Sequence, residues 1–207
     1  MPTSVFVVLV LVIWVATGTG AALFLGRRGF RSPQWYLLGA VLGPLFVPMA
    51  LERAQGRDRV VERTPLADDA PPAAGTVTLV AGVDGSAESD RALRDAVRLF
   101  DTPGARVVLV TAVDPDVVEF EDAAERDRCR ALLAERAAWF TGHRPVVEIV
   151  SGRPASALLD VAAQEGADVV VVGRRGRGLS HRLLGSVAEH VTRHSPVPVL
   201  LAGPATG

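Results

Sequence analysis

The chain has 207 residues, with 22 lysine or arginine side chains, 23 acidic ones and a formal net charge of −1, so we expect no nucleic acid partner. All 22 are arginines, and the absence of lysine excludes a Walker A phosphate-binding loop and a Schiff-base enzyme. The single cysteine, Cys129, excludes an internal disulfide and a cysteine-based zinc cluster.

The N-terminal segment is apolar and long enough to cross a membrane. No charged residue precedes Arg27, and Val5–Leu25 is almost continuously apolar. These 21 residues would form a helix of about 31 Å, close to the thickness of the hydrocarbon core. A cleaved signal peptide would begin with basic residues and have a shorter apolar core. We therefore interpret this segment as a retained membrane anchor.

A second apolar segment, Trp35–Leu51, is interrupted by Gly39, Gly43, Pro44 and Pro48. It is marginal in length for a full crossing, and its prolines would kink it. One arrangement of residues 1–51 is a helical hairpin with both chain ends on the same side of the membrane. The other is a single crossing with a re-entrant or shallow second segment. Gly39 and Gly43 also form a small-xxx-small pair that favours helix association.

Arginines flank both apolar segments. Arg27, Arg28 and Arg31 lie between them, and four more arginines occur from residue 53 to residue 63. For the hairpin, three arginines against four leave the positive-inside rule little to decide, whereas a single crossing with a re-entrant second segment would keep every arginine cytoplasmic. We favour the hairpin, and either arrangement allows a protein of the cell membrane whose C-terminal domain is cytoplasmic.

Residues 52–75 mix charged residues, proline and alanine without a sustained period, so we predict a linker there. From Thr76 onward, short apolar runs alternate with segments of helical periodicity, which predicts a second domain at 76–207. The predicted strands are 76–83, 106–113, 145–150, 167–172 and 197–202, and the predicted helices are 88–100, 116–140, 154–165 and 185–194. This order indicates an α/β fold with a doubly wound, five-stranded parallel sheet.

Two glycine-containing turns follow the first and the fourth predicted strands, at Asp84–Ser86 and Gly173–Gly176. In doubly wound sheets, ligands bind beyond the carboxyl ends of the strands. Glycines can take positive φ and leave no Cβ between the backbone and a ligand, so their N–H groups can form an anion-binding nest. Gly185 and Ser186 then open a helix whose N-terminus favours phosphate. The pattern predicts a phosphate site, with a solvated turn as the alternative.

Four side chains allow more than one interpretation. The carboxylate of Asp84 could accept hydrogen bonds from ribose hydroxyls, or it could form an Asx-turn or cap a helix. The Ser186 hydroxyl could bind phosphate or cap its own helix. His190 and His194 have a spacing that zinc ligands use, but no third ligand is evident, so we interpret them as helix-end or interface residues.

The motifs taken together resemble the universal stress protein family. They are V-D-G-S at Val83–Ser86, G-x-x-G at Gly173–Gly176, and G-S-V-A-E-H-V-T-R-H-S-P-V-P-V-L-L from Gly185, and the resemblance covers Thr76 to about Gly203. It implies an adenine-nucleotide α-hydrolase-like fold that binds ATP, with or without Mg²⁺, and a homodimer formed through the last strand. In the ATP-binding branch the motif reads G-x2-G-x9-G-[S/T].

The resemblance also implies positions for the nucleotide. Asp84 and Gly173 would lie at the ribose and the backbone of Ala112 at the adenine, while the phosphates would be held by Gly176, Gly185, Ser186 and Val187. One departure is that eight residues, Arg177–Leu184, separate the last two glycines where the family pattern has nine. The loop is one residue shorter than the family pattern. It could absorb this difference and leave the glycines in place, or the phosphate contacts could be weakened.

Three classes of function remain open. The first is a membrane-tethered nucleotide-binding module of the stress response. Near the loop there is no general base, no metal-binding carboxylate pair and no nucleophile constellation, so any ATP hydrolysis is expected to be slow. The second is an ATPase or a nucleotidyl-transfer enzyme, although Gly82–Ala87 does not match the S-G-G-x-D-S of ATP-pyrophosphatases. The third is a nucleotide-free scaffold that regulates an unknown membrane partner.

Overall fold

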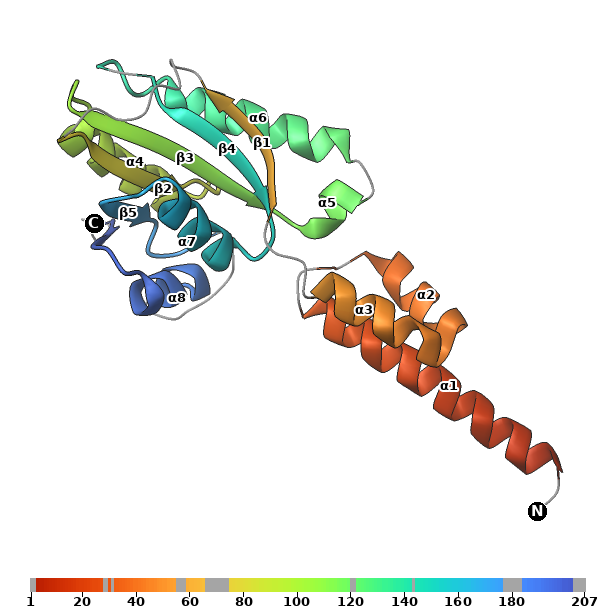
Figure 1. Cartoon of the computed structure of the whole chain (residues 1–207). Helices are drawn as coiled ribbons and strands as arrows, with labels where there is room; N and C mark the ends of the chain where they lie inside the picture. Colours follow the sequence, from red (N-terminus) through yellow and green to blue (C-terminus); the bar gives the residue numbers. More distant parts are fainter. Residues whose placement is uncertain are drawn as a thin grey trace. The chain divides into compact units, whose positions relative to one another are not determined.

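The computed structural model describes residues 3–27, 30, 32–54, 59–65, 75–119, 122–142, 144–176 and 184–202. The chain forms two compact units (Figure 1). The first consists of Met1–Arg57 and Asp114–Glu121, and the second of Asp58–Val113 and Asp122–Gly207.

The first unit is helical. It contains α1 (Thr3–Gly26), α2 (Pro33–Leu42), the 3₁₀ turn η1 (Gly43–Leu45), α3 (Phe46–Ala54) and the short α5 (Pro115–Glu119). Two segments are long and apolar enough to cross a membrane, Thr3–Gly26 with a mean hydropathy of 2.4 and Pro33–Glu52 with 1.4. Membrane insertion of these two segments is a prediction from their length and composition.

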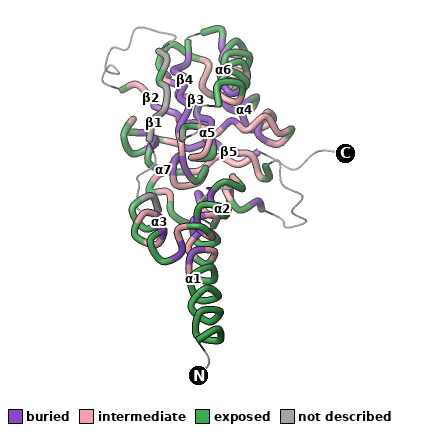
Figure 2. Tube along the Cα trace, turned by 90° about the vertical axis from the view of Figure 1, so that its right-hand side faces the viewer, coloured by how far each residue is buried: buried purple, intermediate pink, exposed green. Residues whose placement is uncertain are grey.

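The second apolar segment is not a straight helix. Gly43 has φ 54°, and the chain reverses there, so that the rings of Trp35 on α2 and Phe46 on α3 lie 6.3 Å apart. Ala22 and Leu25 of α1 belong to the same buried cluster as these rings and Ala50. The N-terminal half of α1 is bare, as Figure 2 shows by its exposed colour. Helix α3 therefore returns along the C-terminal half of α1.

The contact between α1 and α2 depends on glycine. A Cβ on Gly18 would lie 1.8 Å from the carbonyl oxygen of Gly39, so the two backbones touch. At the turn, Trp14 Nε1 donates a hydrogen bond of 3.1 Å to the carbonyl oxygen of Val41. The small-residue pair Gly39 and Gly43 thus joins two helices of the same chain.

The second unit is built on a six-stranded sheet in the order β1-β4-β3-β2-β5-β6. Its strands are β1 (Arg59–Pro65), β2 (Val77–Gly82), β3 (Ala105–Val113), β4 (Val146–Ser151), β5 (Val169–Val172) and β6 (Val199–Leu201). Strands β2 to β6 are parallel, whereas β1 runs antiparallel to β4. The predicted α/β fold with five parallel strands is confirmed. Since the chain winds from β2 to one side and then crosses to β5, the winding direction reverses beside β2.

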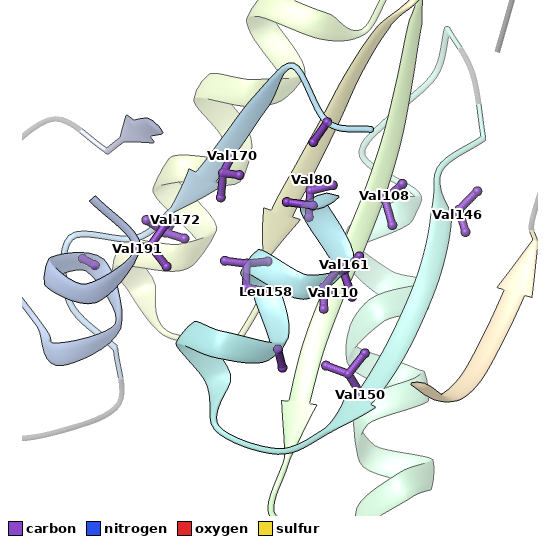
Figure 3. Packing of buried hydrophobic residues seen from close by; sticks show 14 residues of the cluster. Val80, Val108, Val110, Val146, Val150, Leu158, Val161, Val170, Val172 and Val191 are labelled. Carbon is purple, nitrogen blue, oxygen red and sulfur yellow. The ribbon is translucent and has the colours of Figure 1, made fainter. Parts of the chain in front are cut away.

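Helices cover both faces of the sheet. Helices α4 (Ala87–Phe100) and α6 (Ala123–Ala137) contact one face, and α7 (Pro154–Gln164) and α8 (Ser186–His194) contact the other. Figure 3 shows sheet valines facing Leu158 and Val161 of α7 and Val191 of α8. Valine fits this double-sided burial because a β-branched side chain packs well on a pleated sheet.

The helix predicted at 116–140 is two helices. In α5, Asp116 accepts hydrogen bonds of 2.7 Å from the backbone N–H of Ser32 and from Trp35 Nε1, both in the first unit. Helix α6 begins anew after Asp122, whose side chain accepts a hydrogen bond from the backbone N–H of Glu125 at 3.1 Å. The prediction missed this boundary because both pieces share a charged, helical composition.

The prediction of a linker at 52–75 is wrong for residues 59–65, which form β1. In the register of β1 with β4, Arg63 pairs with Glu148, a carboxylate that is only 2% exposed. The guanidinium of Arg63 lies 3.4 Å from Glu148 and 2.6 Å from Glu165. A buried charge is costly unless it is paired, and β1 supplies one cation to this carboxylate. The compact unit accordingly begins at Asp58 and not at Thr76.

Candidate functional site

All seven predicted site residues line one cavity of about 260 Å³. They are Asp84, Ala112, Gly173, Gly176, Gly185, Ser186 and Val187. The cavity lies at the carboxyl ends of β2, β3 and β5, beside the reversal of winding direction where ligands bind in such sheets. Its volume is close to the lower end of small-molecule sites, about 300–1,000 Å³.

The turn after β2 is built by its own side chains. Asp84 Oδ1 accepts a hydrogen bond of 2.9 Å from the backbone N–H of Ser86, which makes an Asx-turn around Gly85, whose φ is 74°. Ser86 Oγ caps α4 by accepting from the backbone N–H of Ser89 at 3.2 Å. The Asx-turn that the sequence offered as one interpretation of Asp84 is therefore formed, through Oδ1. Asp84 also lines the cavity, and its binding to ribose hydroxyls stays a prediction.

The glycines of the second turn are required by close packing and not by positive φ. Among the described residues, the glycines with positive φ are Gly43, Gly75, Gly85, Gly152 and Gly166, so the expectation for the second turn was wrong. A Cβ at position 173 would lie 2.6 Å from the backbone nitrogen of Ser89 at the start of α4. A Cβ at position 176 would lie 2.7 Å from Asp84 Oδ2. The two turns are thus pressed against each other.

Helix α8 opens onto the cavity without a side-chain cap. Gly185 is its N-cap residue and has no side chain to accept a hydrogen bond from the first turn. Ser186 is the first helical residue and is exposed, so the interpretation of its hydroxyl as the helix cap is not realised. The first N–H groups of a helix favour an anion, and α8 presents them beside the loop of Gly173–Gly176.

The ends of the spacer loop are held together. The backbone N–H of Gly185 donates a hydrogen bond of 2.8 Å to the carbonyl oxygen of Arg174. A Cβ on Gly185 would lie 3.3 Å from the Cα of Arg175. Spacer residues 177–183, including His181, lie outside the described residues. The residues on either side of the eight-residue spacer are therefore in contact.

The opposite wall is apolar and includes residues that sequence reasoning missed. Val110, Pro154, Leu158 and Val172 line it, two of them from the first turns of α7. A signal was present, because Gly-Arg-Pro at 152–154 follows the carboxyl end of β4 and starts a helix. Arg175 also lines the cavity and is exposed. The site thus combines an apolar wall with a polar rim of one carboxylate, one guanidinium and backbone N–H groups.

The two histidines of α8 pair with each other. Their rings stack with centroids 4.1 Å apart, and Nδ1 of His194 lies 2.8 Å from the carbonyl oxygen of His190. Burial lowers the pKa of His190 below 6.5, with smaller contributions from His194 and Arg153. Among the described residues, no group of three histidine, cysteine or acidic side chains could hold a metal ion.

Comparison with known proteins gives consistent matches. The model of the universal stress protein family matches residues 77–203. A universal stress protein of Thermus aquaticus is 36% identical over 132 residues, which cover 60% of this chain and 96% of the relative. The solved UspA of Lactobacillus plantarum shares the fold, with a TM-score of 0.54 and 23% identity over 63% of this chain and all of that one. A universal stress protein solved in complex with cAMP is 31% identical, with a TM-score of 0.49, and covers 62% of this chain and 97% of its own.

Proposed function

Because this chain belongs to the universal stress protein family, whose model spans residues 77–203, we propose that it is a membrane-tethered regulatory module of the stress response that binds ATP and forms homodimers. The carrying observation is the convergence of seven residues, predicted from sequence, on one cavity at the reversal point of the sheet. The anchor would hold the module at the cell membrane with residues 58–207 in the cytoplasm.

The chemistry of the cavity wall supports a nucleotide. The apolar side, formed by Val110, Leu158 and Pro154, suits the faces of a base. Asp84 at the rim can accept hydrogen bonds from ribose hydroxyls through Oδ2. The uncapped start of α8 and the nearby guanidinium of Arg175 suit the phosphates, with Mg²⁺ or without it.

The short spacer is compatible with this function. The backbone hydrogen bond between Gly185 and Arg174 joins the two ends of the spacer loop. Gly173, Gly176 and Ser186 are all at the cavity. These positions would let the loop contact phosphate with a spacer of eight residues.

Binding, and not turnover, is the function we propose. Among the described lining residues, the one carboxylate is Asp84, and its Oδ1 is engaged in the Asx-turn. An efficient hydrolase would need a general base or a metal-binding carboxylate pair at the phosphates. Any hydrolysis of ATP would accordingly be slow.

The dimer would form through β6. This strand pairs with β5 along one edge, and its residues Val199–Leu201 are only partly buried. A second copy could cover the other edge, which removes an exposed sheet edge.

The test uses the full chain purified in detergent. Denaturation should release stoichiometric ATP or ADP, or the empty protein should bind added ATP, and Ser186→Ala should weaken binding. Ser156→Ala on α7, outside the cavity lining, is the matched control and should bind normally. Failure of the parent protein to bind millimolar ATP would leave the nucleotide-free scaffold as the better function.

A further inference from the structure

The first unit has the shape of a single membrane crossing with a half-depth insertion beside it. Helix α1 has 24 residues and is about 36 Å long, enough to span the hydrocarbon core. Helix α2 has 10 residues and descends about 15 Å along α1 before the chain turns at Gly43. We propose that this chain crosses the bilayer once, through α1, and that α2 and α3 form a re-entrant loop that enters and leaves on the same side.

The bare half of α1 identifies lipid as the partner of this surface. Every residue from Val5 to Ile13 is exposed, with exposed fractions between 44% and 62%, and none is charged. In a two-span hairpin, the second segment would run down this half of α1 and cover one side of it. Instead Phe46 and Ala50 are buried beside Ala22 and Leu25. Apolar surface on all sides of a helix suits surrounding acyl chains.

At the turn of the loop, backbone N–H and C=O groups form hydrogen bonds within the protein, as they must in hydrocarbon. Non-helical backbone at membrane depth must find its hydrogen bonds inside the protein. The carbonyl of Val41 accepts from Trp14 Nε1, and the N–H of Gly43 donates to the carbonyl of Gly39. The N–H of Phe46 donates to the carbonyl of Gly43. The reversal can therefore lie within the bilayer.

Charge orients the insertion. Arg27 follows α1 and Arg53 lies in the last turn of α3, so both mark the end at which the chain leaves the loop. No charged residue occurs in α1, at the opposite end. Because cytoplasmic flanks of membrane helices are rich in arginine, this end faces the cytoplasm and the N-terminus lies on the other side. This inference concerns the tether of the proposed function and does not depend on nucleotide binding.

Cysteine accessibility tests the topology in the full chain expressed in a bacterial membrane. Single cysteines replace Ser4, Leu45 or Glu52 in a Cys129→Ser background, and an impermeant maleimide is added to intact and to permeabilised cells. Ser4→Cys should react in intact cells, Glu52→Cys only after permeabilisation, and Leu45→Cys only after denaturation. The same variants in the Cys129 background check that the buried thiol and its replacement do not alter the result.

Two results would overturn the inference. Ser4→Cys and Glu52→Cys reacting only after permeabilisation, with Leu45→Cys open to the outside, would establish a two-span hairpin. Recovery of the chain in the soluble fraction would show that residues 1–54 do not insert into a membrane. ATP binding, measured on the same preparations, would report separately on the nucleotide site.

Discussion

Glycine allows backbones to approach closely in both units of this chain, but the result differs: packed helices in one unit and a cavity wall in the other. In the helical unit, Gly18 and Gly39 bring two helices into contact, and the contact leaves no space between them. In the α/β unit, Gly173 and Gly176 press one turn against another, and the same turns form one side of a cavity. Close approach of backbones thus leaves no space between two helices in one unit, whereas in the other unit it forms one wall of a cavity.

The largest effect is expected at the helix contact. In Gly18→Leu, the side chain would collide with the backbone of α2, since even a Cβ would lie 1.8 Å from the Gly39 oxygen. Overpacking of about 3 kcal/mol would separate the re-entrant loop from α1. Maleimide labelling of Leu45→Cys in this background should rise. Gly20→Leu, where a Cβ meets nothing within 4 Å, is the matched control and should leave labelling low.

The second effect concerns the stability of the α/β unit. Gly173→Ala would place a Cβ 2.6 Å from a backbone nitrogen of α4, which cannot move aside as a flexible side chain can. We expect a loss of about 1–3 kcal/mol in the free energy of unfolding, measured by denaturant titration. Gly104→Ala has open space around its Cβ and should unfold like the parent protein. Equal stability of the two variants would contradict the close-packing argument.

A smaller effect is expected for Gly176→Ala, which should change the Kd for ATP more than the stability of the protein. In Gly176→Ala the new Cβ meets the Asp84 carboxylate at 2.7 Å, which can rotate away at the cost of its hydrogen bond from Ser86, a smaller cost than a collision with backbone. The rotation would misplace the rim of the cavity, and we expect about a tenfold rise in the Kd for ATP, or about 1.4 kcal/mol. Calorimetric titration measures this Kd, again with Gly104→Ala as the control. Tight binding by Gly176→Ala would exclude Asp84 from the ribose site.

At the other side of the cavity, Ser186→Ala removes one hydroxyl and leaves the start of α8 intact. Because this residue does not cap the helix, the stability of the protein should hardly change. Loss of one hydrogen bond to phosphate should raise the Kd for ATP about fivefold, or about 1 kcal/mol. A fall in thermal stability without a change in Kd would instead assign the hydroxyl to the fold.

The smallest effect is a pH dependence of α8. The pKa of His190 is lowered in the folded protein, mainly by burial, so the unfolded chain binds the proton first as the pH falls. The contribution to stability is complete above the unfolded value of 6.5 and is lost as the pH falls through the lowered folded value. Unfolding of the parent protein and of His190→Gln between pH 7.5 and 5 should show a shallower loss in the variant.

The sequence by itself determined the elements of the α/β unit and the members of its site. Apolar runs and helical periods are local properties, so the five parallel strands were placed within a few residues. Because the carboxyl ends of parallel strands meet at one edge, Asp84 and Gly173 could be assigned to one place before any contact was known, and the family resemblance added Ala112.

Only the tertiary structure decided how distant segments meet. The strand Arg59–Pro65 has no periodic pattern in the sequence. It pairs with β4, where its Arg63 lies opposite Glu148, a buried carboxylate far along the chain. The reversal at Gly43 depends on packing against Ala22 and Leu25, which hydropathy does not encode. The glycines at 173 and 176 looked like sites of positive φ and are instead points of contact between backbones. Local propensity fixes an element, whereas its partner is chosen by burial, charge and close approach between residues that the sequence keeps apart.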